Sequence, residues 1–282
     1  MTHRVLLIPG TAQDPLRKAA VYRELFSRRR RSLAAAPGQF DYPTQKIGTT
    51  PDGNVTVYYD PSLGQQGSDL AQQVLNSAAD TYNQSQAFFA IAGSPVNVII
   101  AAVNGATDGS GGAYHYGCNF NPGGDLYVDA AFGNLTMTNG LFVAELTESF
   151  MGAQAKGWDC GASNGEALSR FLAEQLTGGA NGALAAYATG PAWDQAGRPN
   201  WIDATEPTDG DAVSTGCGVV YLYWMLSLGY TAAQLTQAGC PDGTLASNYS
   251  TLTGNNTAWA DFSNAVSNLQ NGINGDDPFS AG

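Results

Sequence analysis

Strand-type and helix-type patterns occupy different parts of this 282-residue chain. Alternating or continuous apolar segments, typical of short strands, occur at residues 55–60, 96–103, 113–118 and 125–130. A helical pattern interrupts them at 68–90, and every periodic segment after residue 177 is helical. Strands followed by helices, with little mixing, are typical of the α+β class, which we predict for this chain.

The remaining helical patterns follow in order along the sequence. They cover residues 13–27, 141–154, 164–177, 182–189, 213–228, 231–239 and 256–269. The segment at 213–228 is almost entirely apolar, which predicts a helix buried on all sides.

Charge divides the chain near residue 46. Residues 1–46 hold nine basic and three acidic residues (+6), whereas the remainder holds three basic and 21 acidic residues (−18). A net charge of −18 on residues 47–282 repels the phosphate backbone of nucleic acids. This excludes a nucleic-acid-binding surface on that part of the chain. We predict that residues 1–46 form a basic arm or pro-segment that docks on an acidic surface of its own chain, or of a second copy in a homo-oligomer.

Cysteine and histidine usage limits the kinds of site. The chain has four cysteines without a CxxC pair, and two histidines, His3 and His115, which excludes a structural zinc site of the usual kind. An even cysteine count with only 13% charged residues favours an exported, disulfide-bonded protein. No segment matches a signal peptide or reaches the roughly 18 apolar residues of a membrane span. We expect a secreted or extracytoplasmic protein that does not cross a membrane.

Two predicted helices carry the most informative acidic residues. In Val-Ala-Glu-Leu-Thr-Glu-Ser-Phe (143–150), Glu145 and Glu148 are three positions apart and share a helix face. In Ser-Asn-Gly-Glu-Ala-Leu-Ser-Arg (163–170), Glu166 lies in the first helical turn. Neighbouring carboxylates repel each other unless a cation, a proton or a base compensates them. Glu145, Glu148 and Glu166 are therefore our candidate catalytic residues.

These segments resemble the gluzincin, thermolysin-like branch of zinc metallopeptidases. In that family one helix carries His-Glu-x-x-His, and a second helix supplies a glutamate ligand. Glu145 matches the general-base position and Glu166 the glutamate ligand. The resemblance spans about residues 55–269 and implies a zincin-like fold, with an α/β upper subdomain at 47–155 and a helical lower subdomain at 156–282.

The departures from that family's motif change the expected chemistry. Ala144 and Glu148 stand at the two histidine positions, so both nitrogen ligands are missing and we expect no zinc and no resident cofactor. Three carboxylates offer only oxygen ligands, which suit Ca²⁺, Mg²⁺ or Mn²⁺. Alternatively, one carboxyl stays protonated beside an ionised one and forms a metal-free acid/base pair.

The resemblance also suggests residues around the cleft. His115 and Tyr114 lie on the strand that would border it, Ser214 replaces the family's acid/base histidine, and Trp158 can line a groove for a peptide or glycan ligand. Each candidate has a purely structural alternative: a lone histidine is commonly packed in a core, and tryptophans commonly fill one. Glu166 can complete a capping box or form i,i+4 ion pairs.

We predict two disulfides. Cys118 follows the strand that would border the cleft, and Cys160 lies between the two glutamate-bearing helices, so both would rim one site. Cys217 begins the buried helix and Cys240 ends the next one, as in a helical hairpin. The predicted pairs are thus Cys118–Cys160 and Cys217–Cys240.

Three functions are compatible with these features. We favour a divergent metallopeptidase-like protein with a carboxylate cluster in place of the zinc site, either an altered hydrolase or a pseudo-enzyme. A binding or self-assembly protein that uses its basic arm is the second. The third is a glycoside hydrolase with two catalytic carboxyl groups and aromatic platforms.

Overall fold

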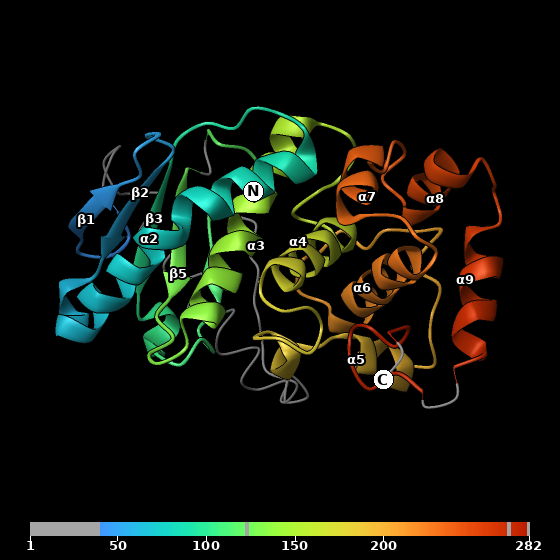
Figure 1. Ribbon diagram of the computed structural model, residues 1–282. Helices are drawn as coiled ribbons and strands as arrows, with labels where there is room; N and C mark the ends of the chain where they lie inside the picture. The colour runs from blue at the N-terminus through green and yellow to red at the C-terminus, as the bar shows by residue number, and fades with distance from the viewer. Residues whose placement is uncertain (1–39, 122–123, 270–271, 281–282) are drawn as a thin grey trace.

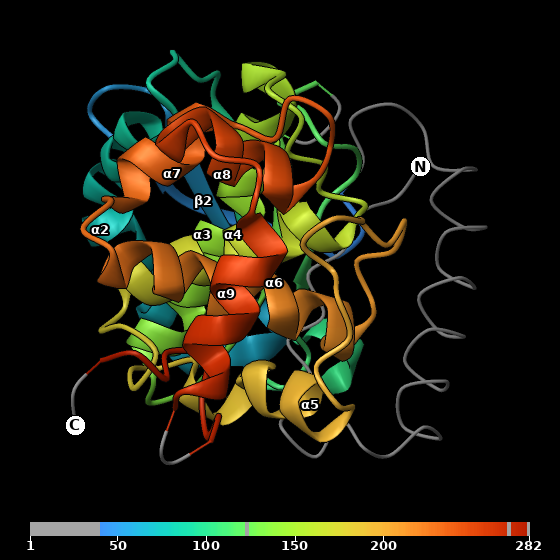
Figure 2. The ribbon, with the colours of Figure 1, turned by 90° about the vertical axis from the view of Figure 1, so that its right-hand side faces the viewer.

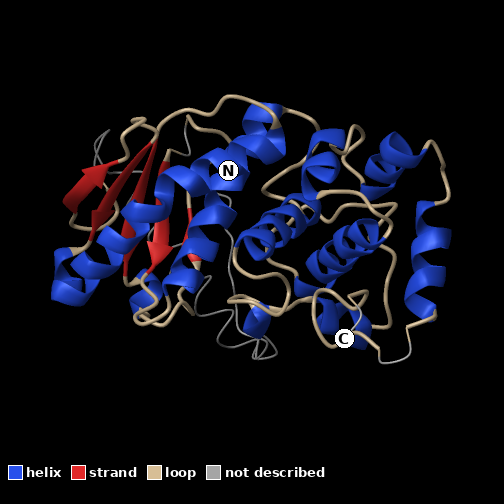
Figure 3. Ribbon diagram, in the orientation of Figure 1, coloured by secondary structure: helices blue, strands red, loops and turns tan. Residues whose placement is uncertain are grey.

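The computed structural model describes residues 40–121, 124–269 and 272–280. Its strands gather at one end of the molecule and helices fill the other, as the colours of Figure 3 show. The predicted α+β class is therefore confirmed. The predicted helix at 13–27 and most of the basic arm lie outside the described residues. None of the helices in the described ranges is long and apolar enough to cross a membrane.

An open, mixed sheet of five strands has the order β1-β2-β3-β5-β4. The strands are β1 (Gln45–Thr49), β2 (Val55–Tyr59), β3 (Val96–Ala101), β4 (Ala113–Tyr114) and β5 (Asp125–Asp129). Strands β2, β3 and β5 are parallel, and the antiparallel β1 and β4 form the two edges. The largely apolar sequence of β3, interrupted only by Asn97, suits its central position, because a central strand is buried on both faces.

Helices α2 (Gly64–Phe89) and α3 (Leu135–Gln154) pack on one face of this sheet (Figure 1). The other face carries an aromatic cluster of Phe40, Tyr42, Tyr58, Tyr114, Tyr116 and Tyr127. The hydroxyls of Tyr114 and Tyr116 both donate to Asp41 Oδ2, at 2.9 and 2.6 Å. Successive side chains of an extended chain point to opposite faces, so these tyrosines direct His115 toward α3.

The helical half is built around the apolar helix α6. Its helices are α4 (Ser163–Leu176), α5 (Gly190–Gln195), α6 (Ala212–Ser227), α7 (Ala232–Ala238), α8 (Leu245–Thr253) and α9 (Ala258–Ser267). Helices α4, α5 and α9 pack against α6, and Figure 2 shows α9 crossing on the outer side. Contact between α3 and α4 joins the two halves and brings together the two glutamate-bearing helices.

The structure differs from the predicted elements where capping decides the outcome. The predicted helix at 182–189 is wrong, because only the 3₁₀ turn Ala185–Tyr187 forms, without a side-chain cap. Helix α8 was not predicted, yet Thr244 caps it by accepting a hydrogen bond from the Ser247 amide. Helix α3 begins at Leu135 because Asn134 caps it in the same way, accepting from the Met137 amide.

Candidate functional site

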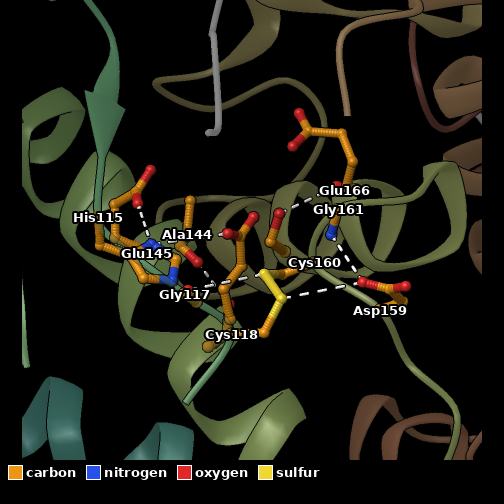
Figure 4. A network of polar contacts seen from close by, with 12 residues as sticks. His115, Gly117, Cys118, Ala144, Glu145, Asp159, Cys160, Gly161 and Glu166 are labelled. Atoms are coloured by element: carbon orange, nitrogen blue, oxygen red, sulfur yellow. Dashed lines mark hydrogen bonds and ion pairs between the residues drawn. A yellow bond between two sulfur atoms is a disulfide. The ribbon is translucent and has the colours of Figure 1, made fainter. Parts of the chain in front are cut away.

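A histidine and a glutamate meet in the interior between the sheet and α3. Nδ1 of His115 lies 2.6 Å from Oε2 of Glu145, and neither side chain is exposed to solvent (Figure 4). His115 directly follows β4, Glu145 lies midway along α3, and these two elements pack together. The structure thus joins a residue predicted to bind substrate with one predicted to be catalytic.

Glu148 lies one helical turn further along α3. Its Oε2 is 3.7 Å from the same His115 nitrogen, and its side chain is also fully buried. Among the described residues, Nε2 of His115 has no hydrogen-bond partner, and the Glu148 oxygens have no close one, since Ser169 interacts with Glu148 only weakly. A buried polar group without a partner costs about 1–3 kcal/mol. Several such groups at one place make this cluster the candidate functional site.

The surroundings favour uncharged forms of His115 and Glu148. Burial lowers the pKa of His115 to about 4, against a smaller raising effect of the Gly117 carbonyl. Burial, followed by the charges of Glu145 and Glu166, raises the pKa of Glu148 well above its ordinary value. At neutral pH the imidazole is therefore neutral, and burial favours the protonated form of Glu148 over its carboxylate.

Glu166, on α4, belongs to the cluster through its charge. Burial raises its pKa well above the ordinary value, while the Arg170 guanidinium lowers it. The capping-box alternative does not hold, since the Ser163 hydroxyl accepts a hydrogen bond from the Glu206 amide instead.

The predicted disulfide Cys118–Cys160 is confirmed, with a Cα–Cα distance of 5.7 Å. It ties the loop after β4 to the loop between α3 and α4. The Cys160 sulfur, a carboxyl oxygen of Glu148 and a ring nitrogen of His115 all lie within 4.8 Å of one another. A Cβ atom added to Gly152 would lie 1.4 Å from the Cys118 carbonyl oxygen, so only glycine lets α3 approach this loop.

The predicted disulfide Cys217–Cys240 is wrong, because both cysteines are free and buried. Cys240 lies beyond the end of α7, where its amide donates to the Lys156 carbonyl at 2.7 Å. Cys217 sits on α6 and interacts with the backbone of Trp201. Burial raises the pKa of Cys217 to about 12 and that of Cys240 well above its ordinary value, so neither is a ready thiolate.

Three other predicted residues make their polar contacts elsewhere. Tyr114 faces the opposite side of the sheet. Trp158 is buried, and its Nε1 donates to the Thr236 carbonyl at 3.0 Å. Ser214 is buried in the first turn of α6, and its hydroxyl donates to the Asp211 carbonyl at 3.3 Å.

One residue that changes the pKa values of the site was not predicted from the sequence. The charge of Asp209 raises the pKa of both Glu148 and Glu166, after burial and other causes. Asp209 precedes α6 in an acidic stretch, Glu206 to Asp211. The density of acidic residues there was the available signal, but nothing in the spacing linked it to α3.

The zinc site of the resembled family does not fit these residues. Ala144 is buried and offers only a methyl group, and Glu148 replaces the second imidazole. Without those two nitrogen donors, the helix lacks the ligand pair on which the family's metal depends. Binding of Ca²⁺, Mg²⁺ or Mn²⁺ by the carboxylates stays a prediction.

No family model, curated protein or solved structure matches this chain. Its function is therefore inferred from the chemistry of the cluster formed by His115, Glu145, Glu148 and Glu166, hereafter the acid/base cluster.

Proposed function

We propose that the protein is a metal-free hydrolase on a metallopeptidase-like scaffold, with His115 and Glu145 as the base and Glu148 as the acid. The 2.6 Å contact between His115 and Glu145, away from all solvent, is the observation that carries this proposal. A charge-assisted hydrogen bond of this length orients an imidazole strongly.

The base is the His115 ring, and Glu145 is its positioning residue. When the Glu145 carboxylate accepts the Nδ1 proton, the ring is held in the tautomer whose lone pair is on Nε2. Nε2 has no hydrogen-bond partner among the described residues, so this lone pair can take a proton from an attacking water. The Glu145 charge then stabilises the imidazolium that forms.

The acid is the Glu148 carboxyl group. Its raised pKa favours the protonated form, which can give its proton to the leaving group. The environment of His115 thus favours its unprotonated form, and that of Glu148 favours its protonated form. Acid/base catalysis requires one group of each kind. Water supplies the nucleophile, and the carboxyl group returns to its protonated form when His115 releases its proton.

A peptide is the substrate class that the resemblance favours. The acid/base cluster is closed off from solvent, so substrate binding requires movement of a covering segment. The glycoside hydrolase alternative is less well supported, because Trp158, Trp193 and Trp224 are buried core residues rather than exposed platforms.

The test is hydrolysis of a mixed peptide library by the full chain, read by mass spectrometry with and without excess chelator. We expect new peptide termini whose yield is unaffected by the chelator and lost in His115→Gln. Cleavage that the chelator abolishes would assign the chemistry to a metal. No cleavage by the full chain, or by the chain lacking residues 1–45, would leave a binding or self-assembly role.

The basic arm supplies a separate prediction from charge alone. Deleting residues 1–45 is expected to change the oligomeric state or to open the acid/base cluster to ligands. The reason is that residues 1–46 carry a net charge of +6, which is attracted to the net charge of −18 on the remainder. Size-exclusion profile, thermal stability and salt dependence check this. If all three match those of the full chain, the arm has no docking role.

A further inference from the structure

We propose that reduction of the Cys118–Cys160 disulfide creates a binding site for a zinc-class transition metal, with His115, Glu148 and Cys160 as ligands. This site differs from that of the resembled family, since it draws one ligand from each of three segments. It goes beyond the proposed function because it requires neither substrate nor turnover.

The donor atoms are already gathered. The ring nitrogen, the carboxyl oxygen and the sulfur lie within 4.8 Å of one another, and all three side chains are buried. Ligand atoms around tetrahedral Zn²⁺, at 2.0–2.3 Å from the metal, are separated by about 3.3–3.8 Å. Metal binding therefore requires the donors to close by about 1 Å, a distance within reach of side-chain adjustment.

The unsatisfied hydrogen-bonding atoms of His115 and Glu148 favour a bound ligand. Among the described residues, Nε2 of His115 has no hydrogen-bond partner, and the two buried Glu148 oxygens have no close one apart from a weak interaction with Ser169. A metal ion would satisfy these groups at once and compensate the carboxylate charge. Imidazole and thiolate are donors that favour Zn²⁺ or Co²⁺ over Ca²⁺ and Mg²⁺.

The disulfide controls whether the third donor exists. In the oxidised protein, the Cys160 sulfur is bonded to Cys118 and cannot be a thiolate. A dithiol reductant transfers two electrons and two protons to the disulfide, yielding two thiols and becoming a disulfide itself. The Cys160 thiol and the Glu148 carboxyl then release their protons as the metal binds.

Two cysteine variants separate the ligand from the disulfide. Cys118→Ser and Cys160→Ser both abolish the bond, but only the first retains the proposed ligand. We expect Cys118→Ser to bind Co²⁺ with a thiolate-to-cobalt charge-transfer absorption, and more than about 100-fold more tightly than Cys160→Ser, since even an outer-shell partner is worth 10- to 100-fold. Cys217 and Cys240 are present in both variants and so contribute the same background.

Further arms make the outcome decisive. Wild-type protein reduced by a dithiol should gain the same absorption, lose it in His115→Gln, and show none while oxidised. If the variants unfold without metal, Co²⁺ should restore the circular dichroism of Cys118→Ser alone. Equal Co²⁺ affinity of the two cysteine variants, or no thiolate band in Cys118→Ser, would overturn this site. Because the readout is metal binding, its failure is distinct from a failure to hydrolyse peptides.

Discussion

Glu145→Gln is expected to lower kcat/KM for peptide hydrolysis by about 10²–10⁴-fold, the range contributed by a positioned acid or base. Glutamine can still accept a hydrogen bond from Nδ1 of His115, but it carries no charge. The imidazolium formed when Nε2 takes a proton then lacks its counter-charge in a site without solvent, where electrostatic interactions are strong. The loss should therefore fall on kcat more than on KM.

Glu174→Gln is the matched control for this substitution. Glu174 is a buried carboxyl group with a raised pKa, like those of the acid/base cluster, but it lies about two turns beyond Glu166 on α4 and accepts a hydrogen bond from the Tyr223 hydroxyl at 2.6 Å. We expect near-normal kcat/KM in this variant at a temperature where it is folded. Equal activity in wild type and Glu145→Gln would remove Glu145 from the mechanism.

Glu148→Met is expected to increase the free energy of unfolding by about 1–3 kcal/mol at pH 8, the cost of a buried polar group that is poorly satisfied. Burial is the largest cause of the raised Glu148 pKa, so the substitution removes a desolvation cost that outweighs the loss of the weaker interaction with Ser169. Urea unfolding at fixed pH measures the difference. The same variant should be inactive, because it lacks the acid.

The pH dependence of that gain has a defined sign. Glu148 has a pKa raised in the folded protein, so its contribution to stability is fully present below the unfolded value of 4.5 and is lost as pH rises toward the folded value. His115 acts in the opposite sense: with a folded pKa of about 4, it costs stability as pH falls from 6.5 toward 4. Above pH 6.5 the His115 ring is neutral in both states, so the slope is set by the buried carboxyl groups and, closer to pH 9, also by the buried thiols of Cys217 and Cys240.

We therefore expect wild-type stability to fall as pH rises above 6.5, with a shallower fall in Glu148→Met. Glu148→Gln is the control, because it removes the ionisation but keeps a polar group; it should flatten the slope with a smaller gain in stability. A Glu148→Met protein that is less stable than wild type at pH 8 would show that the carboxylate is ionised and paired with a cation.

The sequence pattern predicted those parts of the site that depend on local periodicity. Glu145 and Glu148 share a face of α3, as their spacing of three requires, and Cys118 pairs with Cys160. The contact of His115 with Glu145 could not be predicted from the sequence. It depends on a two-residue edge strand, and no local pattern specifies the place of that strand in the sheet.

The wrong predictions have long-range causes. Cys240 appeared to end a helical hairpin, but the chain turns beyond α7 and its amide bonds to Lys156, 84 residues earlier in the chain. Ser163 and Glu166 had the spacing of a capping box, yet the Ser163 hydroxyl contacts Glu206 from a distant loop. In both places a tertiary contact displaces the local one that the sequence suggests.

The protonation state of His115 tests the acid/base cluster most directly, and the chain is suited to it because His3 is its only other histidine. Nitrogen-15 NMR of ring-labelled protein, with His3→Gln to assign the signals, reports the tautomer and the pKa. The proposed mechanism predicts a neutral ring protonated at Nδ1 from pH 8 down to about pH 4. A ring that titrates near 6.5, or one protonated at Nε2, would contradict it.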